Sequence, residues 1–307
     1  MDPHVLPRQP SGGKAHDPLH PTCEAFCPAE SPPLNAIKIF QIFLLFPSFA
    51  ITYRIIKMAK PINLQEKFPH LSKAPIVEAV LDIRVVPSVA WNESTLQTEL
   101  KQRLPDFPKH ETMRSAKFQL PAGTAAPAVE DFGCTGFKLH SSDNPHIVQF
   151  NKGSFVFSRL KPYADWEQFS RSALRLWAVY CELLKPSEIR RIGLRFINRV
   201  AIQQPTIELA DYYKYPPASI KELNWPSGGF LHHDVMQIPE TAYSVNVIKT
   251  IQNVPGEIGL LLDIDVFTQN HFTYNELRII ECVEEMRWVK NKIFFSSLTD
   301  KLIQELT

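Results

Sequence analysis

The sequence predicts an α+β protein with a mostly antiparallel sheet and long helices packed on one face of that sheet. Two observations predict this class. Segments with the two-residue alternation of a half-buried strand occur in clusters, whereas the strands of a doubly wound parallel sheet alternate regularly with helices. Two long segments with a helical repeat of apolar residues each follow such a cluster, which places helices against one face of the sheet.

The first half of the folded region reads as a strand, a helix, several strands and a second helix. Asn92 can cap the first helix, because its side chain can accept a hydrogen bond from a free backbone amide, and Pro105 ends the helix. Asp165 and Gln168 form a variant of the capping box before the second helix, which Pro186 closes. The strands of this half are expected at residues 76–86, 112–120, 136–140, 147–151 and 154–160.

The second half repeats this order. Thr273 and Glu276 form a capping box before the last long helix, followed by a helical tail over 298–306. Strands are expected at residues 189–202, 229–238, 243–251 and 257–267. The apolar face of the last long helix is expected to hold Leu277, Ile280, Val283, Met286, Val289 and Ile293. The repeated order is consistent with an internally duplicated unit, with halves 58–187 and 188–307, inside a single α+β domain.

Residues 1–57 differ from the rest of the chain. They contain nine of the 26 prolines and show no strand or helix period before Asn35, so they bury too little apolar surface to offset the entropy of ordering. The apolar run 39–53 is shorter than the about 20 residues that cross a bilayer, and no membrane partner is expected. We therefore expect a disordered or wrongly assigned N-terminal extension, with the natural start at Met58.

The composition limits the classes of function. Lysine and arginine together number 33 against 32 acidic residues, so the net charge does not favour nucleic-acid binding, although a local basic patch could still provide it. Five cysteines at irregular spacing do not form a disulfide framework, and a cytoplasmic location is expected. We find no glycine-rich phosphate loop, no nucleophile elbow and no metal motif, so no cofactor is expected.

A histidine pair, His232 and His233, invites comparison with a metal site. Neighbouring side chains on a strand point to opposite faces, so both imidazoles cannot bind one ion without a bend in the backbone. No metal site is predicted.

The segment 191–199 is the most informative one for function. With a two-residue period, Arg191, Arg195 and Arg199 share one strand face, while the apolar residues between them face the helices. Guanidinium groups spaced in this way suit the binding of carboxylates or phosphates. An acidic set lies on two other strands: Asp263, Asp265, Glu78 and Asp82.

Three interpretations of these residues stay open. The arginines can form cross-strand ion pairs with the carboxylates, which is a common way to complete the polar face of a sheet. They can instead form a face that binds an anionic ligand or a protein partner, which makes the protein a binding module. Asp263, Asp265 and Glu78 beside the arginines could also serve an enzyme that performs metal-assisted phosphoryl chemistry.

Five segments also resemble a known family. They are residues 74–80, 158–163 with Trp166, 191–199, 262–265 and 295–300. In this order they resemble a sporadically distributed family of uncharacterised bacterial and archaeal proteins, named conserved hypothetical proteins, over about residues 58–307. The resemblance implies a start near Met58 and no particular activity, and the sporadic distribution suits an accessory gene. The family usually has tyrosine where this chain has Phe196.

Overall fold

The computed structural model describes residues 62–119, 128–143, 145–204, 206–218 and 228–307, without the side chains of residues 116–119, 128–130 and 132. These residues all belong to one compact unit, Ile56–Thr307. The predictions for residues 1–57 and for a start at Met58 lie outside the described residues.

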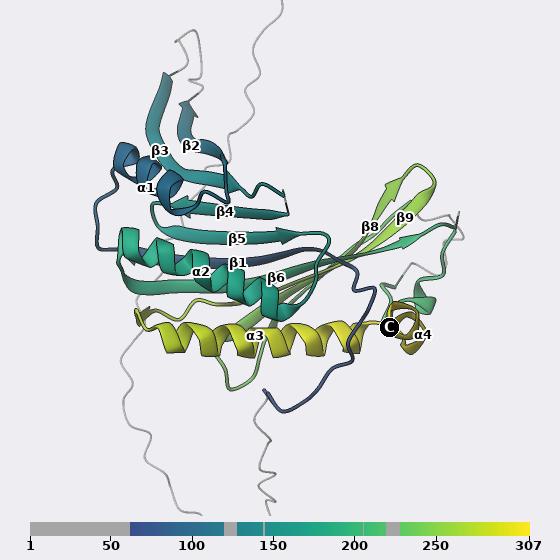
Figure 1. Ribbon diagram of the computed structural model, residues 1–307. Coiled ribbons are helices and arrows are strands. Elements are labelled where there is room, and N and C mark those ends of the chain that lie inside the picture. Colours follow the sequence, from purple (N-terminus) through teal and green to yellow (C-terminus); the bar gives the residue numbers. More distant parts are fainter. Residues whose placement is uncertain (1–61, 120–127, 144, 205, 219–227) are drawn as a thin grey trace, which may run out of the picture. The chain divides into compact units, whose positions relative to one another are not determined.

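The fold is α+β with a ten-stranded antiparallel sheet, as the clustered strands predicted (Figure 1). Its strands are β1 (Ile76–Pro87), β2 (Lys109–Gln119), β3 (Ala128–His140), β4 (His146–Asn151), β5 (Ser154–Leu160), β6 (Pro186–Ile202), β7 (Leu231–Gln237), β8 (Tyr243–Val254), β9 (Glu257–Thr268) and β10 (Phe272–Thr273). Their order in space is β2-β3-β4-β5-β1-β6-β9-β8-β7, and β10 pairs with β6. β1 and β6 therefore lie next to each other in the middle of the sheet.

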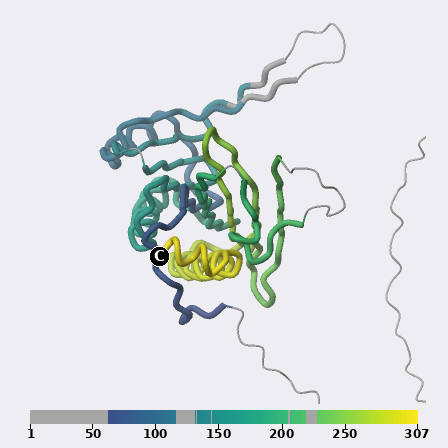
Figure 2. Tube along the Cα trace, turned by 90° about the vertical axis from the view of Figure 1, so that its right-hand side faces the viewer, coloured from purple at the N-terminus to yellow at the C-terminus, as the bar shows by residue number. Residues whose placement is uncertain are grey.

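Two long helices cover one face of the sheet. α2 (Trp166–Leu184) contacts β5 and β1, and α3 (Glu276–Ser297) contacts β6 and β9. Figure 2 shows the two helices side by side on the same side of the strands. The shorter helices are α1 (Glu93–Arg103), the 3₁₀ turn η1 (Leu209–Asp211) and α4 (Asp300–Leu306). None of the helices in the described ranges is long and apolar enough to cross a membrane.

The helix caps follow the sequence pattern at two positions and depart from it at a third. The side chains of Asn92 and Asp165 accept hydrogen bonds from the amides of Thr95 and Gln168, as predicted. For α3 the cap is Asn275 instead of Thr273, because Thr273 pairs with β6 as part of β10.

The apolar face predicted for α3 is also partly wrong. Leu277 is 72% exposed, whereas the buried side chains of this helix include Ile279, Val283, Met286 and Phe294. The buried stripe is therefore rotated relative to the predicted one.

The two halves of the sheet have similar topologies, with β1 to β5 in the first half and β6 to β9 with the short β10 in the second. In each half the first strand is central and pairs with the last long strand of that half, as β1 does with β5 and β6 does with β9. A long helix follows each of these last strands. In the described part of the chain, η1 stands in the second half where α1 stands in the first. This is the topology that an internal duplication would produce, and the duplication itself stays a prediction.

The pleat of the central strands divides their side chains between two faces. On the helix side lie residues that are at most 6% exposed, among them Leu81, Ile83, Leu194, Phe196, Leu262 and Ile264. The alternate residues of the same strands lie on the opposite face, which we call the open face. The core thus holds β1, β6 and β9 in a defined register, and this register positions the polar side chains of the open face.

The burial of the helix-side face predicts a contrast in stability. We expect Leu81→Ala to lower the free energy of unfolding by about 2–5 kcal/mol, because Leu81 is 1% exposed in the middle of β1. Leu277→Ala removes the same atoms from an exposed site and should change stability by less than about 0.5 kcal/mol. Urea denaturation measures the free energy of unfolding of both variants. Equal losses would show that Leu81 and Leu277 are not buried and exposed, respectively.

Candidate functional site

The open face brings the predicted arginines and acids together on three neighbouring strands. Arg191, Arg195 and Arg199 project from β6, and the residues of β1 and β9 lie on either side of them. Arg195 lies directly between Val80 and Asp265, and Gly193 lies between Asp82 and Phe267. The register of the central strands therefore decides which carboxylate each arginine can reach.

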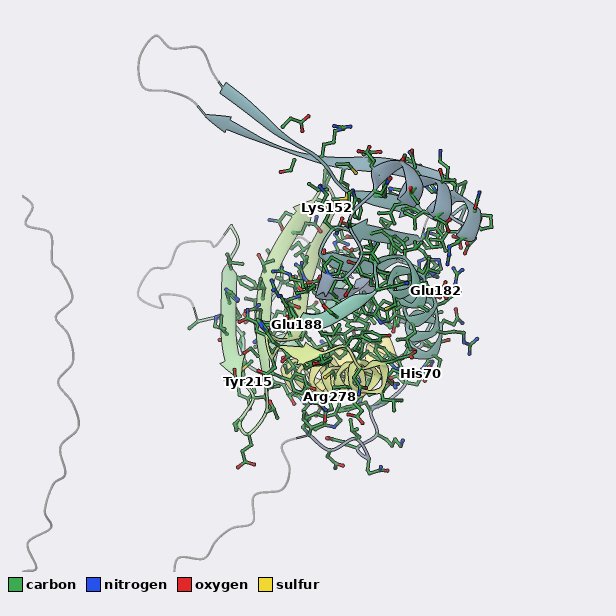
Figure 3. The ribbon with its side chains drawn as sticks, turned by 90° about the vertical axis from the view of Figure 1, so that its left-hand side faces the viewer. His70, Lys152, Glu182, Glu188, Tyr215 and Arg278 are labelled. Atoms are coloured by element: carbon green, nitrogen blue, oxygen red, sulfur yellow. The ribbon has the colours of Figure 1, made fainter. Side chains whose placement is uncertain are left out.

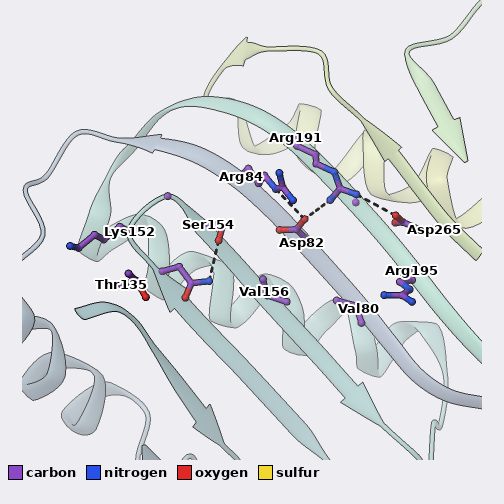
Figure 4. A pocket seen from close by; sticks show the side chains of 13 residues that line it. Val80, Asp82, Arg84, Thr135, Lys152, Ser154, Val156, Arg191, Arg195 and Asp265 are labelled. Atoms are coloured by element: carbon purple, nitrogen blue, oxygen red, sulfur yellow. Dashed lines mark hydrogen bonds and ion pairs between the residues drawn. The ribbon is translucent and has the colours of Figure 1, made fainter. Parts of the chain in front are cut away.

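Arg191 joins two carboxylates from different strands (Figure 4). Its Nη1 donates a hydrogen bond to Asp82 on β1, and its Nη2 lies 3.4 Å from Oδ2 of Asp265 on β9. The guanidinium also lies over the ring of Phe267, 5.0 Å from the centroid. The three charged side chains are only 15%, 21% and 22% exposed, so this is a largely desolvated network.

Burial raises the pKa values of both carboxyl groups in this network. Desolvation is the main cause for Asp82 and for Asp265, and the positive charge of Arg191 opposes it in both cases. The charge of Arg191 therefore favours the ionised form of both acids against the effect of burial.

A glycine makes room for the Arg191 guanidinium. A Cβ atom at Gly193 would lie 2.4 Å from Nη1 of Arg191 and 2.9 Å from its Cζ. The guanidinium thus crosses the backbone at Gly193 to reach both of its partners. Gly259 has the same role for Arg199, because a Cβ there would lie 2.6 Å from Nε of that arginine.

The other two arginines of the row are also paired. Arg195 forms a bidentate pair with Asp263, with an Nε–Oδ1 distance of 2.8 Å, while its own side chain stays 46% exposed. The hydrogen bond to Asp263 raises the pKa of Arg195, and Asp265 and Glu78 add to this effect through their charge. Arg199 contacts Glu257 at 2.5 Å and donates to Gln252 at 2.9 Å.

These contacts show where each of the predicted site residues lies. Arg191, Arg195, Arg199, Asp263 and Asp265 all take part in cross-strand ion pairs, which is the first of the three interpretations above. Glu78 lies opposite Ile197 and forms no ion pair within the described ranges. The structure thus supports a charge-compensated sheet face, and a role of these residues in binding stays a prediction.

An open pocket of about 630 Å³ lies over this network. Its charged lining consists of Arg84, Lys152, Arg191 and Arg195 against Asp82 and Asp265. Arg199, Asp263 and Glu78 are not part of it. β1, β5, β6 and β9 supply the floor, and the β4–β5 turn with Thr135 supplies one wall. Figure 3 shows Lys152 in this turn, near the base of the β2–β3 hairpin.

Two of these cations were not predicted as site residues. Arg84 shares the face of Asp82 in the strand alternation, but nothing in the sequence shows that it stands directly opposite Arg191. Lys152 falls between the strands expected at 147–151 and 154–160, where a single lysine gives no signal of a site. Each becomes a site residue through the pairing of strands that are distant in sequence.

The structure gives no support to the metal-dependent alternative. In the described ranges, no group of three or more histidines, cysteines and acids is arranged to hold a metal ion. Asp263 and Asp265 are directed at arginines. His232 and His233 bind different partners, Asp234 and Asn246.

Neither Cys181 nor Cys282 offers a reactive thiolate. Burial raises the pKa of Cys181 to about 11, and it also raises the pKa of Cys282. Thiols of this kind are weak nucleophiles at neutral pH.

Comparison of the chain with known proteins does not assign a family. No protein-family model matches the chain, and no curated protein matches it.

The close approach at Gly193 predicts a specific coupling. We expect Gly193→Ala to displace the Arg191 guanidinium from Asp82 and Asp265 and to lower the free energy of unfolding by about 1–3 kcal/mol. In an Arg191→Ala background the same change should be neutral or stabilising, because the obstructing group is gone and alanine restricts the unfolded chain more than glycine does. Urea denaturation of the four proteins measures the coupling.

The matched control is Gly228→Ala, since a Cβ at that position meets no atom within 4 Å. If Gly193→Ala lowers the free energy of unfolding equally in the Arg191→Ala background, Gly193 does not make room for the Arg191 guanidinium.

Proposed function

We propose that this protein is a binding module whose open sheet face takes an anion in the pocket lined by Arg84, Lys152 and Arg195. The observation that carries the proposal is the unequal pairing of the charged groups around this pocket. In its floor, Arg191, Asp82 and Asp265 neutralise one another. At its rim, Arg84 shares its one carboxylate with Arg191, and Lys152 has no ion pair in the described ranges.

Arg84 is the clearest of these rim cations. It stands opposite Arg191, and like charges in directly opposed positions destabilise a sheet. Its one ion-pair partner in the described ranges is Asp82, at 3.7 Å, and Asp82 already accepts a hydrogen bond from Arg191. The Arg84 side chain is 63% exposed, so its charge is available to a ligand.

Lys152 adds a second available charge on the other side of the pocket. It is exposed at the β4–β5 turn, and no acidic side chain of the described ranges lies within ion-pair distance of it. The carbonyl oxygen of Thr135 accepts a hydrogen bond from its amide at 3.0 Å, which holds the turn against β3. An anion with several oxygen atoms could then contact Arg84, Lys152 and the exposed part of Arg195 together.

The proposal accounts for the balanced net charge of the chain, because it requires only a local excess of positive charge. It favours a small polyanion or an acidic segment of a protein over extended nucleic acid, which is bound through many phosphate contacts. We also propose a cytoplasmic location, which the free thiols of Cys134, Cys181 and Cys282 support.

Titration calorimetry with tripolyphosphate at low ionic strength tests the proposal. We expect saturable binding, weakened about tenfold or more in the variant Arg84→Ala/Lys152→Ala, because two charge-assisted contacts are lost. These two positions are chosen because neither substitution leaves a buried carboxylate unpaired. Poly-glutamate as a second probe distinguishes a carboxylate partner from a phosphate ligand.

The matched control is Lys101→Ala/Lys301→Ala, which removes the same charge from exposed positions on α1 and α4. The control should bind as the unmodified protein does. Absence of binding to both probes at low salt, or equal weakening in both double variants, would refute the proposal.

A further inference from the structure

A second cavity lies on the helix side of the sheet, between α3, the segment 64–76 and the start of α2. Its volume is about 410 Å³, and its walls include Phe68, Trp166, Trp288 and Phe295. Figure 3 shows His70, another lining residue, beside α3. Pro75, Tyr163, Trp166, Asn198 and Phe295 come from four of the five segments that carry the family resemblance, and they meet at this cavity.

Lys290 lines the cavity as a half-buried residue of α3, beside the buried stripe of that helix. Along the helix it follows Met286 by one turn and precedes Phe294 by one turn, and both of these residues are buried. Its Nζ lies 4.1 Å from the ring centroid of Phe196, a fully buried residue of β6. The amine therefore reaches the sheet at the inner end of the cavity.

This amine has no polar partner in the described part of the chain, in contrast to its neighbours on α3. Lys292 contacts Glu66 at 2.6 Å. Arg287 contacts Glu284 at 3.4 Å and Glu167 at 3.8 Å, and it lies over the ring of Trp166. The neighbouring cations of α3 are thus paired with carboxylates, whereas no carboxylate of the described residues pairs with Lys290.

The surroundings also decide the protonation of Lys290. Burial, followed by the positive charge of Arg287, lowers its pKa to about 7. The titratable and charged groups that face the cavity are Arg287 and Glu284 from α3, Tyr163, Asp165 and Glu167 from the start of α2, and Glu66, Lys67 and His70 from the N-terminal segment. At neutral pH a large fraction of Lys290 therefore carries a free electron pair.

We propose that Lys290 is a nucleophile that forms an imine with the aldehyde or ketone group of an apolar-bodied molecule bound in this cavity. The amine electron pair attacks the carbonyl carbon, and a proton moves from nitrogen to the carbonyl oxygen. The resulting carbinolamine loses water as the C=N bond forms, so the step needs no oxidant or reductant. The aromatic walls hold the body of the molecule.

The charge around the cavity favours a neutral carbonyl compound over an organic anion. Four carboxylates line it (Glu66, Asp165, Glu167 and Glu284), whereas its cations other than Lys290 are Lys67 and Arg287. An anion approaching Lys290 would pass this acidic lining, while an uncharged aldehyde or ketone meets no such barrier.

Reductive trapping tests the proposal on the full chain. The protein is incubated with benzaldehyde and sodium cyanoborohydride at pH 7, which reduces the imine in preference to the free aldehyde, and the modified lysines are identified by peptide mass spectrometry. We expect Lys290 to be labelled about tenfold or more faster than Lys292, because the ion pair with Glu66 stabilises the charged ammonium form of Lys292, which has no free electron pair. The rate of labelling at Lys290 should reach half of its maximum near pH 7.

Two variants serve as controls. Lys290→Met keeps the length of the side chain and should abolish the fast label, while Lys292→Met should retain it. Both should keep the unmodified circular dichroism spectrum, so that loss of label reports loss of the amine. Labelling of Lys290 no faster than of Lys292, or labelling that requires pH values near 10, would overturn the proposal.

Discussion

The contact on which the open face depends is the pairing of Arg191 with Asp82 and Asp265 across three central strands. Asp82 belongs to the first half of the fold, and Arg191 and Asp265 belong to the second, so the network joins the halves where β1 meets β6. Its carboxylates are largely desolvated, and within the described ranges removal of the arginine would leave Asp265 without an ion pair and Asp82 with Arg84 alone, at 3.7 Å. The pairing is therefore a requirement of the fold as well as a feature of the surface.

This constraint also shapes the proposed binding site. Because the floor of the pocket is neutralised internally, a ligand gains little from Arg191 and gains most from the rim cations Arg84 and Lys152. The floor then acts as a rigid base that holds Arg84 opposite Arg191. The proposal thus places the ligand contacts on the charged groups that the cross-strand pairs leave incomplete.

The alternation of residues 191–199 was enough to predict which face the arginines occupy, and the same period in the acidic strand correctly predicted Asp263 and Asp265 as their neighbours. The choice between Asp82 and Glu78 could not be predicted, because it depends on the register of β1 against β6. Lys290 was missed for a related reason. The apolar repeat of its helix fits two stripes, and only packing against the sheet selects the buried stripe beside which this lysine lies.

The most direct test of the central claim is a carbon NMR titration of the aspartate carboxyl groups in the unmodified protein and in Arg191→Gln. The account predicts that Asp82 and Asp265 titrate above the ordinary value of 3.8, and higher still without Arg191. Because their pKa values are raised in the folded state, their contribution to stability falls as the pH rises through those values, and it should fall further in the variant. Carboxyl groups that titrate at or below 3.8, or that do not respond to loss of Arg191, would contradict the account.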